Sequence, residues 1–192
     1  MKLDKATVAQ QVRHTIEKTN RRAKGFQSQS EAMLRHRPRP DQWSMLDCLD
    51  HINLFYAEYM PRLERAIAQA PRTERATYTP GWLGQKMMTG LRPKQGERKM
   101  KIKTFRRMNP ATEGKSYESV LETFLTYHTQ LDALLTEAVP LDWDRAKVVS
   151  AVGPLLRFKL GDCFRVLLAH TERHLRQAEE VLEAQSDEMA VS

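Results

Sequence analysis

The sequence predicts an all-α protein, a four-helix bundle, on three observations. Four long segments repeat apolar residues every three or four positions, the spacing of one buried helix face. No segment shows the strict alternation of a half-buried strand. The chain has 192 residues, 41% of them apolar, which is enough for one hydrophobic core. We therefore expect a single domain over residues 1–185 and a flexible tail over residues 186–192.

The first two helices are bounded by their capping and proline residues. We expect the first from about Lys5 to Arg35, because the prolines at 38 and 40 disfavour helical backbone just before them. The second begins after Ser44, an N-cap residue, with Asp47 three positions on as a shortened capping box. Pro61 lies inside its apolar pattern, so we expect a kink or a break near Tyr59.

A long connection, residues 71–115, separates the second helix from the third. A connection of this length rarely lacks structure of its own, and we expect a short helix over Trp82 to Leu91 within it. The third long helix is predicted from about Ser116 to just before Pro140, and the fourth over residues 160–184.

The net charge of +7 is concentrated in one segment. Residues 86–107 contain nine Lys or Arg and one acid, Glu97, so this segment carries +8 and the rest of the chain −1. A solvated loop is the ordinary interpretation. Attraction of an anionic small substrate is a second one. Nucleic-acid binding is a third and is unlikely, because such arms interleave stacking aromatics and Phe105 is the only aromatic residue here.

Composition also bears on the compartment. Two cysteines cannot form a disulfide framework. No apolar run approaches the roughly 20 residues of a membrane-spanning helix, and the first residues lack the apolar core of a signal peptide. We therefore expect a cytoplasmic protein that does not enter a membrane.

Three histidines are the candidate metal ligands. His170 and His174 are four residues apart and lie on the predicted buried face of the fourth helix. Buried imidazoles need partners for their nitrogens, and a shared divalent metal satisfies both rings at once. His51, on the flank of the second helix's apolar face, supplies a third ring, which leaves open positions for water or substrate. The pattern is not the His-Glu-x-x-His of zinc proteases, because Thr171 follows His170.

For several other residues a functional role is conceivable, but a structural role is the stronger interpretation. His128 is a reserve ligand. Cys48 and Cys163 lie on the histidine-bearing faces, although buried cysteine usually acts as a small apolar residue. Asp47 can orient an imidazole, but a helix cap is the stronger interpretation. The three tryptophans, Trp43, Trp82 and Trp143, are expected to anchor loops at the ends of the bundle.

Two motifs resemble those of a known family. Residues 43–51, Trp-Ser-Met-Leu-Asp-Cys-Leu-Asp-His, resemble the Trp-Ser-x-x-Glu-x-x-x-His signature of the DinB-like (DinB/YfiT) superfamily, with Asp47 in place of Glu. Leu160-Gly161-Asp162 followed by His170, His174 and Gln177 is similar to the signature of that family's last helix. The order and separation of the motifs extend the resemblance over nearly the whole chain.

The resemblance implies both a topology and a cofactor. It implies an up-down-down-up bundle with a long crossover between the second and third helices. It also implies a divalent metal ion, zinc or nickel, held by His51, His170 and His174, and a homodimer. Some relatives are thiol-dependent S-transferases that use mycothiol or bacillithiol.

Three hypotheses of function follow. The first is a metal-dependent transferase or hydrolase acting on a small-molecule substrate, with a low-molecular-weight thiol as a candidate. No catalytic base can be named from the sequence. The second is a metal-binding or stress-response module without catalysis. The third is nucleic-acid binding through residues 86–107, with an affinity that falls steeply with salt.

Overall fold

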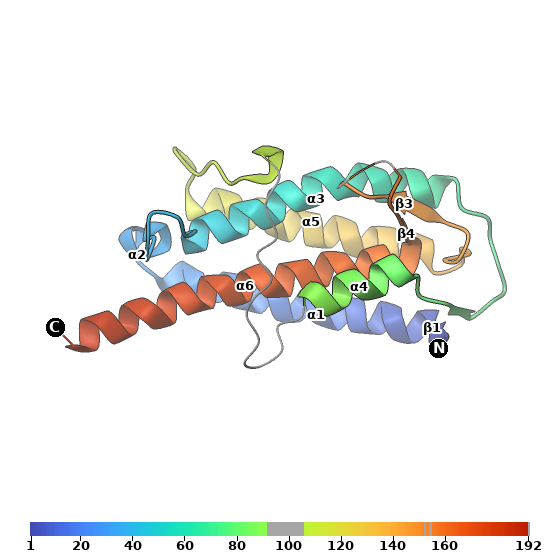
Figure 1. Ribbon diagram of the computed structural model, residues 1–192, viewed down its shortest axis with the longest axis horizontal. Coiled ribbons are helices and arrows are strands. Elements are labelled where there is room, and N and C mark those ends of the chain that lie inside the picture. The colour runs from blue at the N-terminus through green and yellow to red at the C-terminus, as the bar shows by residue number, and fades with distance from the viewer. Residues whose placement is uncertain (92–105, 152, 154, 192) are drawn as a thin grey trace.

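Four long helices form the bundle in the computed structural model, which describes residues 1–91, 106–151, 153 and 155–191. They are α1 (Lys5–Gly25), α3 (Met45–Ala68), α5 (Tyr117–Ala138) and α6 (Leu160–Val191). Figure 1 shows α1 and α6 running one way and α3 and α5 the other. Each helix packs on two neighbours: α3 lies against α5 and α6, and α1 lies against the same two. The predicted up-down-down-up bundle is confirmed.

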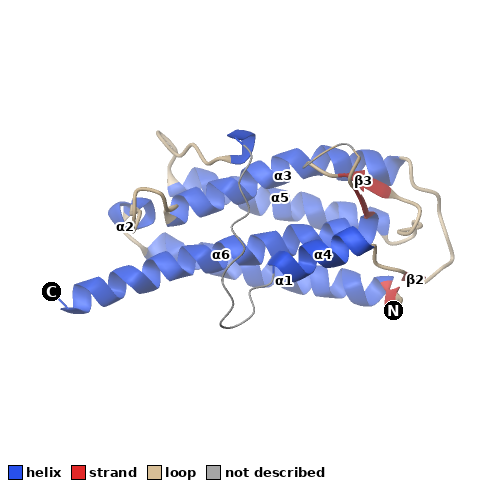
Figure 2. Cartoon of the chain, viewed as in Figure 1, coloured by secondary structure: helices blue, strands red, loops and turns tan. Residues whose placement is uncertain are grey.

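Short elements complete the fold. Two are helices, α2 (Glu31–Arg35) and α4 (Trp82–Leu91), and the second matches the short helix predicted in the crossover. Two antiparallel strand pairs lie at one end of the bundle (Figure 2): β1 (Leu3–Asp4) with β2 (Thr77–Tyr78), and β3 (Lys147–Val149) with β4 (Arg157–Lys159). The sequence analysis missed these strands, because two or three residues are too few to show an alternating pattern.

Helix starts follow the predicted caps. The Ser44 hydroxyl accepts from the Asp47 N–H and the Asp47 carboxylate accepts from the Ser44 N–H, so the capping box is present despite the shorter acid. Ser116 caps α5 in the same position. The predicted single first helix is wrong beyond Gly25. There the chain turns through a 3₁₀ segment, η1 (Phe26–Ser28), that buries Phe26, and Ser30 then caps α2.

Two other helix boundaries differ from expectation. Helix α3 runs unbroken through Pro61, so the predicted break near Tyr59 is wrong. Burial of Tyr59, Met60 and Leu63 on both sides of Pro61 holds the helix together there, because tertiary packing outweighs local propensity. Helix α6 continues to Val191, beyond the end predicted near Ala184.

The Gly161-Asp162 pair shapes the end of the bundle that holds the crossover. A Cβ on Gly161 would lie 2.4 Å from the buried Trp143 ring, so the close approach requires glycine. The Asp162 carboxylate, also buried, accepts from the Gly81 N–H at 2.6 Å and from the Tyr78 hydroxyl at 3.3 Å. This motif therefore docks the crossover onto α6. Among the described residues, no helix combines the length and apolar character needed to cross a membrane.

Candidate metal centre

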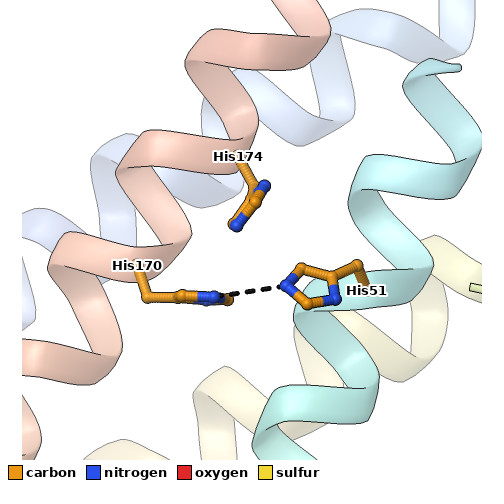
Figure 3. A group of neighbouring side chains, drawn as sticks. All are labelled: His51, His170 and His174. Atoms are coloured by element: carbon orange, nitrogen blue, oxygen red, sulfur yellow. Dashed lines mark hydrogen bonds between the residues drawn. The ribbon is translucent and has the colours of Figure 1, made fainter. Parts of the chain in front are cut away.

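The structure brings the three predicted histidines together between α3 and α6 (Figure 3). His51 comes from α3, and His170 and His174 come from successive turns of α6. Their exposed fractions are 3%, 8% and 9%, so all three rings are buried. One nitrogen from each ring lies within 4.8 Å of the other two, and the Nε2 atoms of His51 and His170 are 3.2 Å apart.

Hydrogen bonds outside the cluster determine which nitrogens face into it. His51 Nδ1 is 2.7 Å from the Met108 carbonyl oxygen. A carbonyl only accepts, so Nδ1 carries the proton and Nε2 presents a lone pair to the cluster. His174 Nδ1 donates in the same way to Gln177 Oε1 at 3.1 Å. Both rings are therefore held in the tautomer that a metal ligand of this kind needs.

His170 has no such outer partner. Its Nδ1 is buried without a hydrogen bond, and its ring stacks on Phe55 with centroids 3.8 Å apart. Its Nε2 faces the lone pair of His51 Nε2. A hydrogen bond between these two nitrogens gives His51 and His170 a partner. It gives no partner to Nε2 of His174. The cluster thus has more inward lone pairs than its own protons can satisfy.

These distances fit a divalent ion. Imidazole nitrogens at 2.0–2.1 Å from a tetrahedral zinc stand about 3.3 Å apart, close to the 3.2 Å between His51 and His170. One nitrogen of His174 lies within 4.8 Å of a nitrogen on each of these two rings. Three neutral imidazoles suit zinc, nickel and copper. The three buried histidines can therefore hold a metal ion.

Burial keeps the rings neutral, as ligands must be. Desolvation lowers the pKa of His51 below its ordinary value, against the opposing effect of the hydrogen bond to Met108. Burial and the neighbouring histidines lower the pKa of His170 well below its ordinary value. Burial, with His51 adding to it, lowers the pKa of His174 to about 3. None of the three has to lose a proton before binding a metal at neutral pH.

Two aromatic rings enclose the cluster. The Trp43 ring lies over His51 and His174, at centroid distances of 4.6 and 5.6 Å, and Phe55 covers His170. Trp43 therefore contacts two of the three histidines, which its expected role as a loop anchor did not include. Trp143 does anchor an end of the bundle and donates to the Ala138 carbonyl. Trp82 does not, because 71% of its surface is exposed.

Asp47 does not orient a histidine. Besides capping α3, it accepts from Thr112 at 2.8 Å and pairs with Arg37 at 2.8 Å. Burial acts to raise its pKa, but these hydrogen bonds outweigh burial and hold the pKa below its ordinary value. The outer partner of His51 is the Met108 backbone instead, so the cap interpretation of Asp47 is confirmed.

The two cysteines stay outside the cluster. Both thiols are buried and free, and burial raises the pKa of each. Within the described residues, the group of possible metal ligands that contains His51 includes no cysteine or carboxylate. Cys48 and Cys163 therefore serve as small apolar residues of the core.

His128 is not a reserve ligand, because its ring nitrogens are both used elsewhere. Nε2 lies 3.0 Å from the Tyr56 hydroxyl, which is 3.0 Å from the Thr171 hydroxyl, and Nδ1 is bonded to Asn20. These four buried or part-buried residues come one from each long helix, and we call them the interhelix network. The pairing of His128 with Tyr56 gives the buried tyrosine hydroxyl a hydrogen-bond partner.

Most of the predicted charged stretch, residues 92–105, lies outside the described residues. Arg107, at its end, donates to the Ala151 carbonyl at 2.6 Å and pairs with Glu58 at 3.2 Å. This one residue is engaged with the bundle.

Fold and site together define a class: an up-down-down-up helical bundle with three buried histidines that can hold a metal ion between two antiparallel helices. The chain belongs to the DinB superfamily, whose family model matches residues 11–178. The resemblance drawn from the two motifs is thereby confirmed. No curated protein gave a match. No solved structure matched either.

The sequence analysis missed the outer partners of the ligand rings. Gln177 stands in the quoted motif three residues after His174, and that spacing on one helix face was the available signal. Nothing marked Met108. Its carbonyl is a backbone group that every residue carries, and it meets His51 from 57 positions along the chain.

Proposed function

We propose that this chain binds one divalent metal ion, zinc or nickel, through Nε2 of His51, His170 and His174, and acts with it on a small-molecule substrate. The observation that carries the proposal is the orientation of the rings: outer hydrogen bonds fix the protons of His51 and His174 on Nδ1, and one nitrogen from each of the three rings lies within 4.8 Å of the other two. Two rings oriented in this way beside a third support a metal site, because one shared ion would satisfy a nitrogen lone pair from each ring.

The residues divide the work of the site. A bound ion would act as a Lewis acid, lowering the pKa of a water or thiol toward neutrality. Met108 and Gln177 keep the ligand rings oriented, while Trp43 and Phe55 exclude water from the faces of the rings. Three protein ligands leave at least one coordination position for a substrate atom.

The reaction we propose is thiol-dependent S-transfer, with hydrolysis as the second reaction class. Sulfur is a preferred ligand of zinc, and a low-molecular-weight thiol would present it at the open position. The family resemblance supports the thiol. We also propose that the protein is a homodimer and lies in the cytoplasm, as its sequence predicts. Light scattering after size-exclusion chromatography tests the homodimer.

Elemental analysis of tag-free protein tests the metal. We expect about one zinc or nickel per chain in the wild type after loading and dialysis, and loss of stoichiometric metal in His51→Ala and His174→Ala. His14→Ala is the matched control, because His14 is exposed and outside the cluster. A wild type that retains no metal, or a His14→Ala that loses it equally, contradicts the proposal.

One observation favours the alternative of a metal-binding module without catalysis. In the part of the chain that the structure describes, no Asp, Glu or Cys joins the three-histidine group. A screen of thiols with electrophilic acceptors separates the two. Turnover that His170→Ala abolishes supports the enzyme, and retained metal without turnover over the whole screen supports the module.

A further inference from the structure

Residues 106–115, which we call the strap, lie along α3 and are fastened to it at successive points. Arg107 pairs with Glu58. The Met108 carbonyl accepts from His51. The strap then continues to Asp50 and Asp47, so it runs antiparallel to the helix and crosses the metal-facing histidine between its fixed ends.

The fastening on the far side of His51 uses two buried carboxylates. Asp50 accepts from the Ala111 N–H at 3.1 Å and pairs with Lys115 at 2.7 Å. Asp47 accepts from Thr112, whose carbonyl in turn accepts from Arg35 at 3.1 Å. Asp50 and Asp47 are 4% and 0% exposed. Lifting the strap would take the Ala111 N–H and Lys115 from the Asp50 carboxylate and Thr112 from the Asp47 carboxylate, which would keep Arg37. The strap is therefore held closed by groups that do not touch the histidines.

We propose that the strap positions the metal ligand His51, with Asp50 and Lys115 as positioning residues that act through the Met108 carbonyl. The link is geometric. Met108 accepts the Nδ1 proton at 2.7 Å and so decides that Nε2 carries the lone pair. Its carbonyl is correctly placed only while Ala111 and Lys115 are tied to Asp50. The metal half of this inference rests on the proposed function, whereas the tautomer half does not.

Coupling of this kind works in both directions. If closure of the strap strengthens metal binding by some factor, bound metal strengthens closure of the strap by the same factor. The strap amides that donate to α3, the Ala111 N–H above all, should then exchange with deuterium more slowly in the metal-loaded protein. A strap with a purely structural role would exchange at the same rate in both forms.

The test compares Asp50→Asn and Lys115→Met with a conservative variant and a control. Lys115→Arg keeps the charge and should restore wild-type behaviour. Arg13→Met removes a cation as exposed as Lys115, 42% against 41%, from its ion pair with the more exposed Asp132, between α1 and α5 and away from the cluster. We expect about tenfold weaker zinc binding in Asp50→Asn and Lys115→Met, the lower end of the effect of losing an outer partner of a ligand. Lys115→Arg and Arg13→Met should bind as the wild type does.

A metal-free measurement makes the inference independent of the metal. The ¹⁵N chemical shifts of the His51 ring report its tautomer. We expect protonated Nδ1 in the wild type and in Arg13→Met, and a mixture of tautomers in Asp50→Asn and Lys115→Met. An unchanged tautomer in both strap variants overturns the inference, as does zinc affinity equal to that of the wild type. If the wild type takes up no zinc, the proposed function fails and the ring shifts alone decide on the strap.

Discussion

Two groups of buried histidine in this bundle look alike by burial and differ in their partners. His128 is fully buried, and burial lowers its pKa to about 3. His174 is 9% exposed, with a pKa lowered to about 3 mainly by the same cause. Yet both nitrogens of His128 have protein partners, whereas the lone pairs of the cluster point at one another. Burial and pKa alone would not separate a structural histidine from a histidine of the proposed metal site.

The difference teaches what each group is for. The interhelix network takes Asn20, Tyr56, His128 and Thr171 from four different helices, and its hydrogen bonds run from one to the next. It is complete within the chain, and we interpret it as a device that fixes the packing of the four helices. The cluster, by contrast, is complete only when something accepts its lone pairs.

The largest expected effect is on stability in the presence of metal. Zinc or nickel at about 1,000 times its Kd should stabilise the wild type by about 4 kcal/mol, because the ion binds the native state only. Thermal unfolding with and without the ion measures this. His174→Ala should show almost none of the gain.

His128→Gln is the control for that experiment, because it alters a histidine of equal burial outside the cluster. It should keep the full metal-dependent gain. If His128→Gln loses the metal-dependent stabilisation while His174→Ala keeps it, the metal site lies at His128 and the cluster is structural.

The second prediction concerns the metal-free protein. His128→Ala should lower the free energy of unfolding by about 3 kcal/mol, since it leaves a cavity and removes one of the two partners of the buried Tyr56 hydroxyl. Urea unfolding measures the loss. His51→Ala in the same metal-free conditions should lower the free energy of unfolding by less, because it removes the close approach of His51 Nε2 to His170 Nε2. Equal losses in the two variants would show that the cluster is as well satisfied as the network.

The third prediction is a pH dependence of His128. An unfolded-chain histidine titrates near 6.5, above the native pKa of about 3, so between these values the unfolded chain holds a proton that the native state does not. The stability contributed by the neutral ring is complete above about pH 6.5 and decreases as the pH falls toward 3. From pH 7 to pH 5 the loss is about 2 kcal/mol.

Comparison with His128→Gln isolates the contribution of His128 to the pH dependence of stability. The other histidines titrate equally in both proteins, so their contributions cancel in the difference. In metal-free protein, the difference in unfolding free energy between wild type and His128→Gln should move by about 2 kcal/mol between pH 7 and pH 5, to the disadvantage of the wild type. A difference that stays constant with pH would show that His128 is not neutral and buried in solution.

Sequence patterns predicted the three histidines of the cluster better than the hydrogen-bond partners that orient their rings. His170 and His174 were found because four-residue spacing places both on one helix face, and His51 through its place on the second helix. Ser44 was found as a cap because its chemistry is local. The Met108 carbonyl was not, since its approach to His51 depends on tertiary structure. His128 was misjudged for the same reason: its partners Asn20 and Tyr56 come from other helices.

The smallest effect tests whether the interhelix network is a single connected unit. Tyr56→Phe removes one hydroxyl and separates His128 from Thr171. We expect a loss of about 1 kcal/mol in the free energy of unfolding, because a typical buried hydrogen bond contributes about that much. A double-mutant cycle with Thr171→Val measures the coupling. Since the two hydroxyls are 3.0 Å apart, their losses should not add. Additive losses would mean that Tyr56 serves His128 alone, and the network would then join three helices through His128 and leave α6, the helix of His170 and His174, outside it.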